Sequence, residues 1–386
     1  MFFLNNFMKK SKLFFLKYFY YILAFSTYLY IIVFTFLHNR KNDGYVLGDW
    51  LINYQDGGFK RRGISGSLFF FLQDFSGLNL NILVFSFQFI VISLFFFFFI
   101  KLVRNKKITL LYLSLLLSPL GFIAYFNCVD YVGKKEFILF LLFTYFTYLL
   151  NYSKLSLRKE YLVAFLLFIA VLFHEVVLFY IPYFIILLIL KTEKLEPKRY
   201  LKYLLAVFMP AILIIAFGNN INEGNSLEIL KQRGVIITNG IFFWNIDERE
   251  YILSQIRDYM LYPISFLISF FHIKFYLKEE FRNWKIIGLY FLLAFLFSLP
   301  LFVLAIDWGR WIYIHMMMII ITLSAMLNEE SYKEEDPLYT KKNIFIFIFI
   351  IFSLIYRVEM SGKGFTFEGF LYRTIMIPGE LINKML

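Results

Sequence analysis

Apolar runs of roughly twenty residues recur along the whole chain, and they constrain its fold more than any other feature. A bilayer core about 30 Å thick needs roughly 20 consecutive apolar residues per helix. Hydrophobic residues make up 60% of the 386 positions and the mean hydropathy is +0.69, well above the usual apolar share of soluble domains. The pattern therefore predicts an all-α fold, a polytopic bundle of transmembrane helices.

About 11 segments are long and apolar enough to be predicted as membrane spans. The runs 161–173 and 176–190 form either a tight hairpin broken near His174 and Glu175 or one long tilted helix; basic residues on both flanks favour the hairpin. The first span is too long for a signal-peptide core and lacks a cleavage site, so we expect it to remain as an anchor. The predicted spans are 14–37, 80–100, 108–127, 136–150, 161–173, 176–190, 201–217, 259–276, 286–306, 312–327 and 344–356.

The distribution of basic residues predicts the orientation. Lysine and arginine gather in short loops that alternate along the chain, and cytoplasmic loops attract such clusters. We therefore expect the N-terminus inside, the tail 357–386 outside, and a single integral membrane domain over 1–386. The net charge of +12 fits basic cytoplasmic loops and anionic lipid, so no nucleic-acid partner is expected.

Two loops on the predicted outer side are long enough to hold a functional site. The first outward loop, 38–79, contains a predicted interfacial helix over 64–72. The larger outward loop, 218–258, contains two predicted amphipathic helices, near 226–233 and 247–258. A loop of this kind can form a lid over an outward cavity.

The first outward loop contains the stretch GDWLINYQDGGFKRRGISGSL, in which two glycines precede three consecutive cations. Glycines let the backbone turn sharply and expose N–H groups to an anion. Arg61 and Arg62 offer paired donors that match phosphate oxygens, and Lys60 adds a point charge. A phosphate or pyrophosphate site is one interpretation; a topology signal and a glycine turn leading into an interfacial helix are the others.

Two carboxylates precede the triplet, and each has two interpretations. An outward carboxylate beside a phosphate-linked donor can act as general base on an acceptor hydroxyl, which makes Asp49 and Asp56 candidate catalytic residues. Either residue can instead cap a helix or pair with the arginines. Trp50, next to Asp49, is a candidate for positioning a sugar ring.

Two further polar patches interrupt the apolar runs. His174 and Glu175 need partners because burying either group unpaired costs several kcal/mol; they form either a polar hinge or a catalytic pair, and the HExxH metalloprotease pattern is absent. In AIDWGRWIYIH, Trp308 is either a membrane anchor or a sugar-stacking ring, while Asp307 and Arg310 can hold hydroxyls or an anion.

The motifs DWLINYQDGGFKRRGISG, HE and DWGRW together resemble bacterial oligosaccharide-repeat-unit polymerases (Wzy-type) and related GT-C membrane glycosyltransferases. The resemblance spans most of the chain as a hydropathy pattern, but only these three patches carry it specifically. It implies a GT-C-like fold in a bacterial cytoplasmic (inner) membrane, with an acidic residue of the first outward loop, Asp49 or Asp56, at the site.

The resemblance also implies the reaction and the partners. Sugars linked to polyprenyl (pyro)phosphate would be polymerised on the outer face for surface polysaccharide, alongside membrane lipid and polysaccharide-assembly proteins. No cofactor is expected, and no metal, since the first outward loop lacks Asp-x-Asp and the single cysteine, Cys128, excludes a cysteine-based cluster. A lipid-linked oligosaccharide flippase remains as one alternative, and a membrane acyltransferase with His174 as its candidate catalytic histidine as another.

Overall fold

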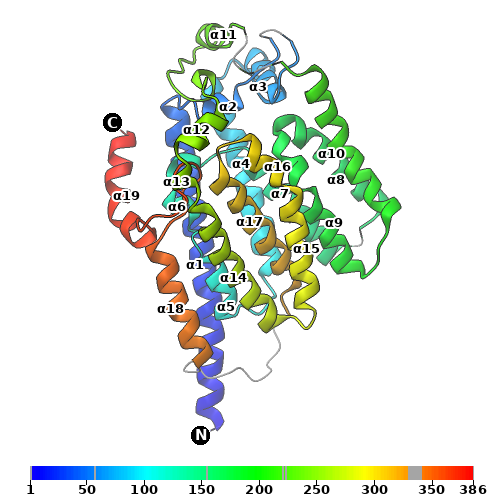
Figure 1. Ribbon diagram of the computed structural model, residues 1–386, viewed down its shortest axis with the longest axis vertical. Coiled ribbons are helices and arrows are strands. Elements are labelled where there is room, and N and C mark those ends of the chain that lie inside the picture. Colours follow the sequence, from blue (N-terminus) through cyan, green and yellow to red (C-terminus); the bar gives the residue numbers. More distant parts are fainter. Residues whose placement is uncertain are drawn as a thin grey trace. The chain divides into compact units, whose positions relative to one another are not determined.

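The computed structural model describes residues 2–55, 58–153, 155–219, 221, 224–328 and 341–385 (Figure 1). Regular structure in these residues is helical, and the described part of the chain contains no β-strand. Two isolated backbone bridges occur, between Lys60 and Asn219 and between Arg357 and Thr366. The prediction of an all-α chain is confirmed.

Seven helical segments are long and apolar enough to cross a membrane. Two shorter apolar helices, Glu136–Tyr152 and Lys342–Ile355, accompany them. The structure therefore supports a multi-pass helical membrane protein, while a total of about 11 spans stays a prediction. The seven segments are Phe15–Arg40, Leu80–Val103, Glu175–Thr192, Pro197–Phe217, Ile256–Glu280, Trp284–Leu304 and Trp308–Met326.

The predicted span 108–127 is not a single helix. It contains α5 (Leu110–Leu116) and α6 (Ala124–Asn127), with a compact turn between them. In this turn a Cβ on Gly121 would lie 2.4 Å from the Leu116 carbonyl oxygen, so only glycine fits. The chain folds back on itself here instead of continuing as a helix.

The segment 161–190 is broken at the polar dipeptide, as the favoured prediction of two short helices requires. α8 (Leu157–Phe173) ends before His174, which is extended with φ −158° and ψ 108°. A 3-10 helix, η2 (Glu175–Tyr180), then leads into α9 (Ile181–Thr192). The segment is therefore not one uninterrupted helix. The break carries the two ionisable side chains, His174 and Glu175.

The contacts within the chain divide it into two compact units. Unit 1 comprises 1–30, 96–128 and 248–380, and unit 2 comprises 31–95, 129–247 and 381–386. α1 (Phe2–Arg40) and α4 (Leu80–Val103) contribute residues to both. The single integral membrane domain that the sequence predicts over 1–386 stays a prediction.

Unit 1 is built around α17 (Trp308–Met326), whose residues are nearly all buried. α14 (Tyr262–Glu280) and α16 (Leu299–Leu304) pack against it. The unit also contains α5, α6, α12 (Glu248–Ser254), α13 (Ile256–Tyr259), α15 (Trp284–Phe297), α18 (Lys341–Ile355) and most of α19 (Phe370–Met385).

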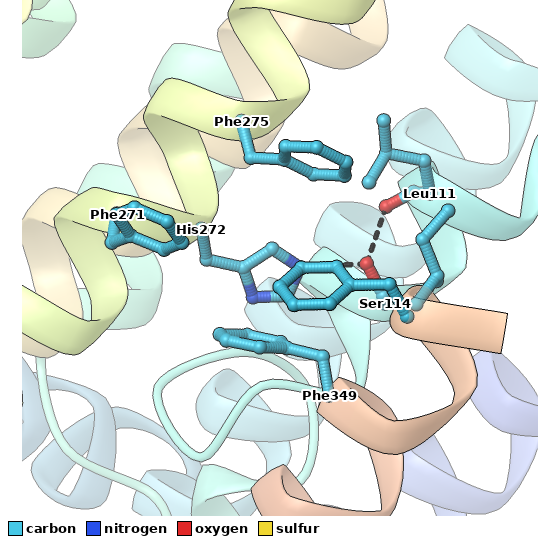
Figure 2. Close-up of a pocket in the computed structure, with 8 residues that line it drawn as sticks. Leu111, Ser114, Phe271, His272, Phe275 and Phe349 are labelled. Carbon is cyan, nitrogen blue, oxygen red and sulfur yellow. Dashed lines mark hydrogen bonds between the residues drawn. The ribbon is translucent and has the colours of Figure 1, made fainter. Parts of the chain in front are cut away.

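A serine–histidine pair joins two helices inside unit 1. Ser114 Oγ of α5 lies 2.6 Å from His272 Nε2 of α14, and Phe349 packs edge-on against the imidazole (Figure 2). The pocket at this pair measures only about 10 Å³, at the lower limit for one water molecule. We interpret the pair as a hydrogen-bonded link between apolar helices.

Unit 2 holds both the first outward loop and most of the larger one. Its helices include α2 (Leu47–Trp50), α3 (Gly63–Ser76), α7 (Glu136–Tyr152) and α10 (Pro197–Phe217), and α10 packs along α8. η1 (Val129–Tyr131), α11 (Ser226–Gln232) and η3 (Ile241–Phe243) are short. Helices lie where the sequence predicts them near 226–233 and 247–258, as α11 in unit 2 and as α12 with α13 in unit 1, and their amphipathic character stays a prediction.

The two outward loops share one hydrophobic core within unit 2. Trp50 and Phe69 of the first loop pack in the same cluster as Leu230 and Ile237 of the larger loop. On the opposite side of α3, Phe71 and Phe75 are exposed one helical turn apart. α3 lies where the sequence predicts an interfacial helix over 64–72, and its place at a membrane interface stays a prediction.

Candidate functional site

A cluster of buried charged side chains lies in unit 2, where several helix ends meet. Asp49 comes from α2, Arg62 from the start of α3, Lys135 from the start of α7, and His174 and Glu175 from the break between α8 and α9. Charged groups are expensive to bury unless paired. Three parts of the chain, namely the first outward loop, the start of α7 and the break between α8 and α9, therefore converge on one polar site.

The turn after α1 positions Asp49. The carbonyl of Asp43 accepts backbone N–H groups of Val46, Leu47 and Gly48, which starts the short helix α2. The Asp43 carboxylate also accepts the N–H of Tyr45 and holds the His38 ring at 2.6 Å. Asp49 then sits on this helix with a side chain only 4% exposed.

Glycines position Arg62. The residue has φ +64°, a left-handed conformation that few non-glycine residues adopt. Gly63, the next residue, packs directly on the Tyr54 ring. A Cβ on Gly63 would lie 2.3 Å from a carbon of that ring, so the chain can follow this path only with glycine there. Gly66 donates its N–H to the Ile52 carbonyl, and a Cβ there would also be 2.3 Å from that oxygen. The two glycines of the RRGISG stretch thus allow close packing of the backbone against Tyr54 and Ile52.

Arg62 joins the two carboxylates of the site. Its Nη1 donates to Asp49 Oδ1 at 3.1 Å, while Nη2 and Nε donate to Glu175 at 2.7 to 3.1 Å. Paired contacts of this kind match the planar guanidinium. A residue in a sparsely populated conformation persists only when its surroundings fix it, and these bonds do so.

Lys135 adds a second cation beside Asp49. Its Nζ lies 3.9 Å from Asp49 Oδ1, donates to Ser65 Oγ at 3.0 Å, and sits 5.6 Å from the Trp50 ring centroid. Just upstream, Gly133 has φ +79°, and its carbonyl accepts the Trp50 indole N–H at 2.9 Å. This turn delivers Lys135 to the site as α7 begins.

His174 stands between two acids. Its Nδ1 lies 3.7 Å from Glu175 Oε2, and its Nε2 lies 4.0 Å from Glu136 Oε1. Glu136 occupies the first turn of α7, where the helix dipole favours a negative charge. The site is thus a row of ionisable side chains in which acids lie next to basic groups: Lys135, Asp49, Arg62, Glu175, His174 and Glu136.

The environment sets the protonation states. Burial raises the pKa of Asp49, but the charges of Lys135 and Arg62 outweigh it and hold that pKa well below its usual range. Burial lowers the pKa of Lys135 to about 8, although Asp49 opposes the change. Burial, together with Arg62, lowers the pKa of His174. Asp49 is therefore ionised and His174 neutral at neutral pH.

One oxygen of Asp49 has no hydrogen-bond partner among the described residues. Oδ1 faces Arg62, whereas Oδ2 is buried and has no hydrogen-bond partner among the described residues. A buried carboxylate oxygen left without a donor is costly. A hydroxyl group placed against Oδ2 would supply the missing hydrogen bond.

The three cations of the triplet have different environments. Arg61 is 48% exposed, and its Nε lies 3.5 Å from Glu175 Oε1. Arg62 is only 12% exposed and engaged on both sides. Lys60 is buried, and its Nζ lies 3.5 Å from Ser226 Oγ of α11. Arg61 is the one best placed to meet a ligand from outside.

The other predicted site residues do not join this cluster. Trp50 is 1% exposed, with Phe69, Phe87 and Phe173 edge-on around its ring, so in this structure it serves the core and offers no open face to a sugar. Asp56 lies outside the described residues. Asp307, Trp308 and Arg310 belong to unit 1.

The Asp-Trp-Gly-Arg-Trp turn forms its own network in unit 1. Arg310 donates to Asp307 Oδ2 at 3.0 Å, and the Trp308 ring meets the Tyr259 ring edge-on at 5.2 Å. A Cβ on Gly309 would lie 1.8 Å from the Glu359 carbonyl oxygen. The glycan-binding role predicted for this turn stays a prediction.

Sequence reasoning did not assign site roles to Lys135, Glu136 or Ser65. The signal available was a Gly-Lys-Lys-Glu run at the start of an apolar helix, where charges need a partner.

No group of three or more His, Cys, Asp or Glu side chains within the described part of the chain could hold a metal ion. Comparison with protein-family models, curated proteins and solved structures found no match.

The lowered pKa of Lys135 predicts a pH effect on stability. The folded pKa is about 8, below the ordinary value of about 10.4, so between these values the unfolded chain binds more protons. The free energy of unfolding contributed by this group therefore rises with pH across that window. Thermal midpoints in detergent should rise from pH 8 to 10 for the wild type relative to Lys135→Met. A gap that stays constant or changes in the opposite sense would contradict this protonation state.

Proposed function

We propose that the protein is a membrane glycosyltransferase that polymerises sugars linked to polyprenyl (pyro)phosphate. The supporting observation is the buried row of charges around Asp49, one oxygen of which has no hydrogen-bond partner among the described residues. Buried ionisable groups in a membrane protein commonly mark a site. A carboxylate held ionised beside cations suits a reaction in which a hydroxyl attacks and a phosphate leaves.

In this proposal Asp49 is the general base. Its Oδ2 accepts the hydrogen bond of the acceptor hydroxyl and takes the proton as the new C–O bond forms at the anomeric carbon. The bond to the lipid pyrophosphate breaks, and the leaving oxygen keeps the electron pair. A low pKa does not prevent this step, because the hydroxyl becomes strongly acidic as its oxygen bonds to carbon.

The cations of the site have two different roles in this proposal. Arg61, half exposed at the edge of the cluster, neutralises the departing pyrophosphate. Arg62 and Lys135 act as positioning residues, because they hold Asp49 ionised and oriented. The negative charge of a pyrophosphate bound at Arg61 would raise the pKa of Asp49 toward that of a better base.

The wider setting is part of the same proposal. We place the reaction on the outer face of a bacterial cytoplasmic membrane, in a GT-C-like bundle of about 11 spans, with lipid-linked oligosaccharide as substrate and surface polysaccharide as product. The seven apolar helices support a membrane location, and the packing of the larger outward loop against the first outward loop supports a covered site.

Loss of the protein should leave single repeat units that are already flipped and attached to their final acceptor, without longer chains. The glycan profile of a deletion strain, resolved on a gel, measures this directly. Accumulation of unflipped units on the inner leaflet would instead identify a transporter, and the enzyme proposal would then be abandoned.

A further inference from the structure

A cavity of about 230 Å³ lies in unit 1, apart from the charged row of unit 2. Helix ends surround it: the end of α14, the end of α17 and the start of α18, with residues that precede α5. One water molecule occupies about 30 Å³ in the liquid, so the space admits a small polar group. In the predicted orientation these helix ends face the cytoplasm.

Half of the residues that line this cavity are apolar, and the other half are polar or charged. Lys107, Lys342 and Glu280 supply charge, and Thr109, Asn328 and Asn343 supply hydrogen-bonding groups. Side chains without charge or polar groups cover the rest: Leu16, Leu110, Leu111, Phe281, Met326, Leu327 and Ile346. A lining of both kinds fits an amphipathic molecule whose polar end is enclosed and whose apolar part follows the helices.

Two polar groups on α14 lack hydrogen-bond partners among the described residues. Tyr276 is fully buried, and its hydroxyl has no such partner. Glu280, one helical turn away on the same face, is half buried, and the charges of Lys342 and Lys107 act on its carboxylate without a direct hydrogen bond. The neighbouring Glu279 is different, because it pairs with Lys342 at 2.5 Å. A donor placed in the cavity against Glu280 would make a direct hydrogen bond to its carboxylate.

We propose that this cavity binds the head group of an aminophospholipid. The phosphate lies by Lys107 and Lys342, the primary ammonium donates to Glu280, and the apolar lining takes the first part of the lipid chains. A purely anionic head group would leave Glu280 without its donor and repel it. A choline head group has the charge but no N–H to donate. The fit is therefore to a phosphate and a primary amine together.

Lipid preference of the purified full-length protein tests this proposal. We expect phosphatidylethanolamine to bind at least about tenfold more tightly than phosphatidylcholine or phosphatidylglycerol with the same chains, since one hydrogen bond to a charged group corresponds to about a tenfold change. Native mass spectrometry of the delipidated protein with each lipid measures this ratio. Equal binding of the three lipids would overturn the proposal.

Single substitutions test whether the residues of this cavity cause the lipid preference. Glu280→Gln should reduce phosphatidylethanolamine binding to the phosphatidylcholine level, and Lys107→Gln should weaken all three lipids, because each carries a phosphate. Lys278→Gln, an exposed position on the same helix, is the matched control and should change nothing. A retained preference in Glu280→Gln would contradict the assignment. Soluble phosphoethanolamine binding as tightly as the lipid would show that a free metabolite, and not a lipid, is the ligand.

Discussion

Arg62→Ala is expected to destabilise the protein by about 3–5 kcal/mol, the usual cost of removing one partner from a buried ion pair. The guanidinium is the shared partner of Asp49 and Glu175, so its removal takes the nearest cation from the buried Asp49 and from the partly buried Glu175. We expect low membrane levels and a much lower thermal midpoint in detergent. Arg62→Lys should recover only part of the stability, because an ammonium cannot reproduce the paired contacts on both sides.

Arg61→Ala is the matched control for this effect. Arg61 is half exposed, and its Nε lies 3.5 Å from Glu175, so we expect a change in stability within about 0.5 kcal/mol. Glycan extension should nevertheless be lost if Arg61 binds the pyrophosphate. Equal stability of the Arg61 and Arg62 variants would contradict the structural role of Arg62. Normal glycan extension by Arg61→Ala would remove Arg61 from the proposed site.

Asp49→Asn should reduce glycan extension by about 10²–10⁴-fold, the typical contribution of a general base, while the protein stays folded. The amide keeps the shape of the side chain and an oxygen for Arg62, but it cannot take a proton. Asp74→Asn is the control, because Asp74 is an exposed partner of Arg233 in the same unit. Extension by Asp49→Asn at the wild-type rate, with both variants at normal membrane levels, would show that Asp49 is not the base.

The charged residues of the first outward loop and of the His-Glu break could be selected from the sequence, because ionisable groups beside apolar runs need partners. Their partners could not be selected in the same way. Asp49 and Arg62 are close in sequence, but Glu175 lies far along the chain, and only the folded structure brings it to Arg62. The structure also separates Arg61 from Arg62, which look equivalent in the triplet.

Trp50 shows the limit of reasoning from residue type. Tryptophan beside a carboxylate is typical of both a sugar platform and a core anchor, and the two differ only in burial. Its indole N–H is bonded to the Gly133 carbonyl and its ring is enclosed. The helical class was predictable for a different reason, because the length and apolarity of spans follow from the bilayer itself. The turn at Gly121 was missed because an apolar run hides a fold-back of the chain.

Elongation by the purified protein tests the central claim most directly. Lipid-linked repeat units extracted from a deletion strain are mixed with the full-length protein in proteoliposomes, and the chain length of the lipid-linked product is measured by mass spectrometry. We predict products longer than one repeat unit with the wild type and with Asp74→Asn, and single units only with Asp49→Asn. Single units in every reaction, from wild-type protein that is folded and reconstituted, would contradict the glycosyltransferase proposal.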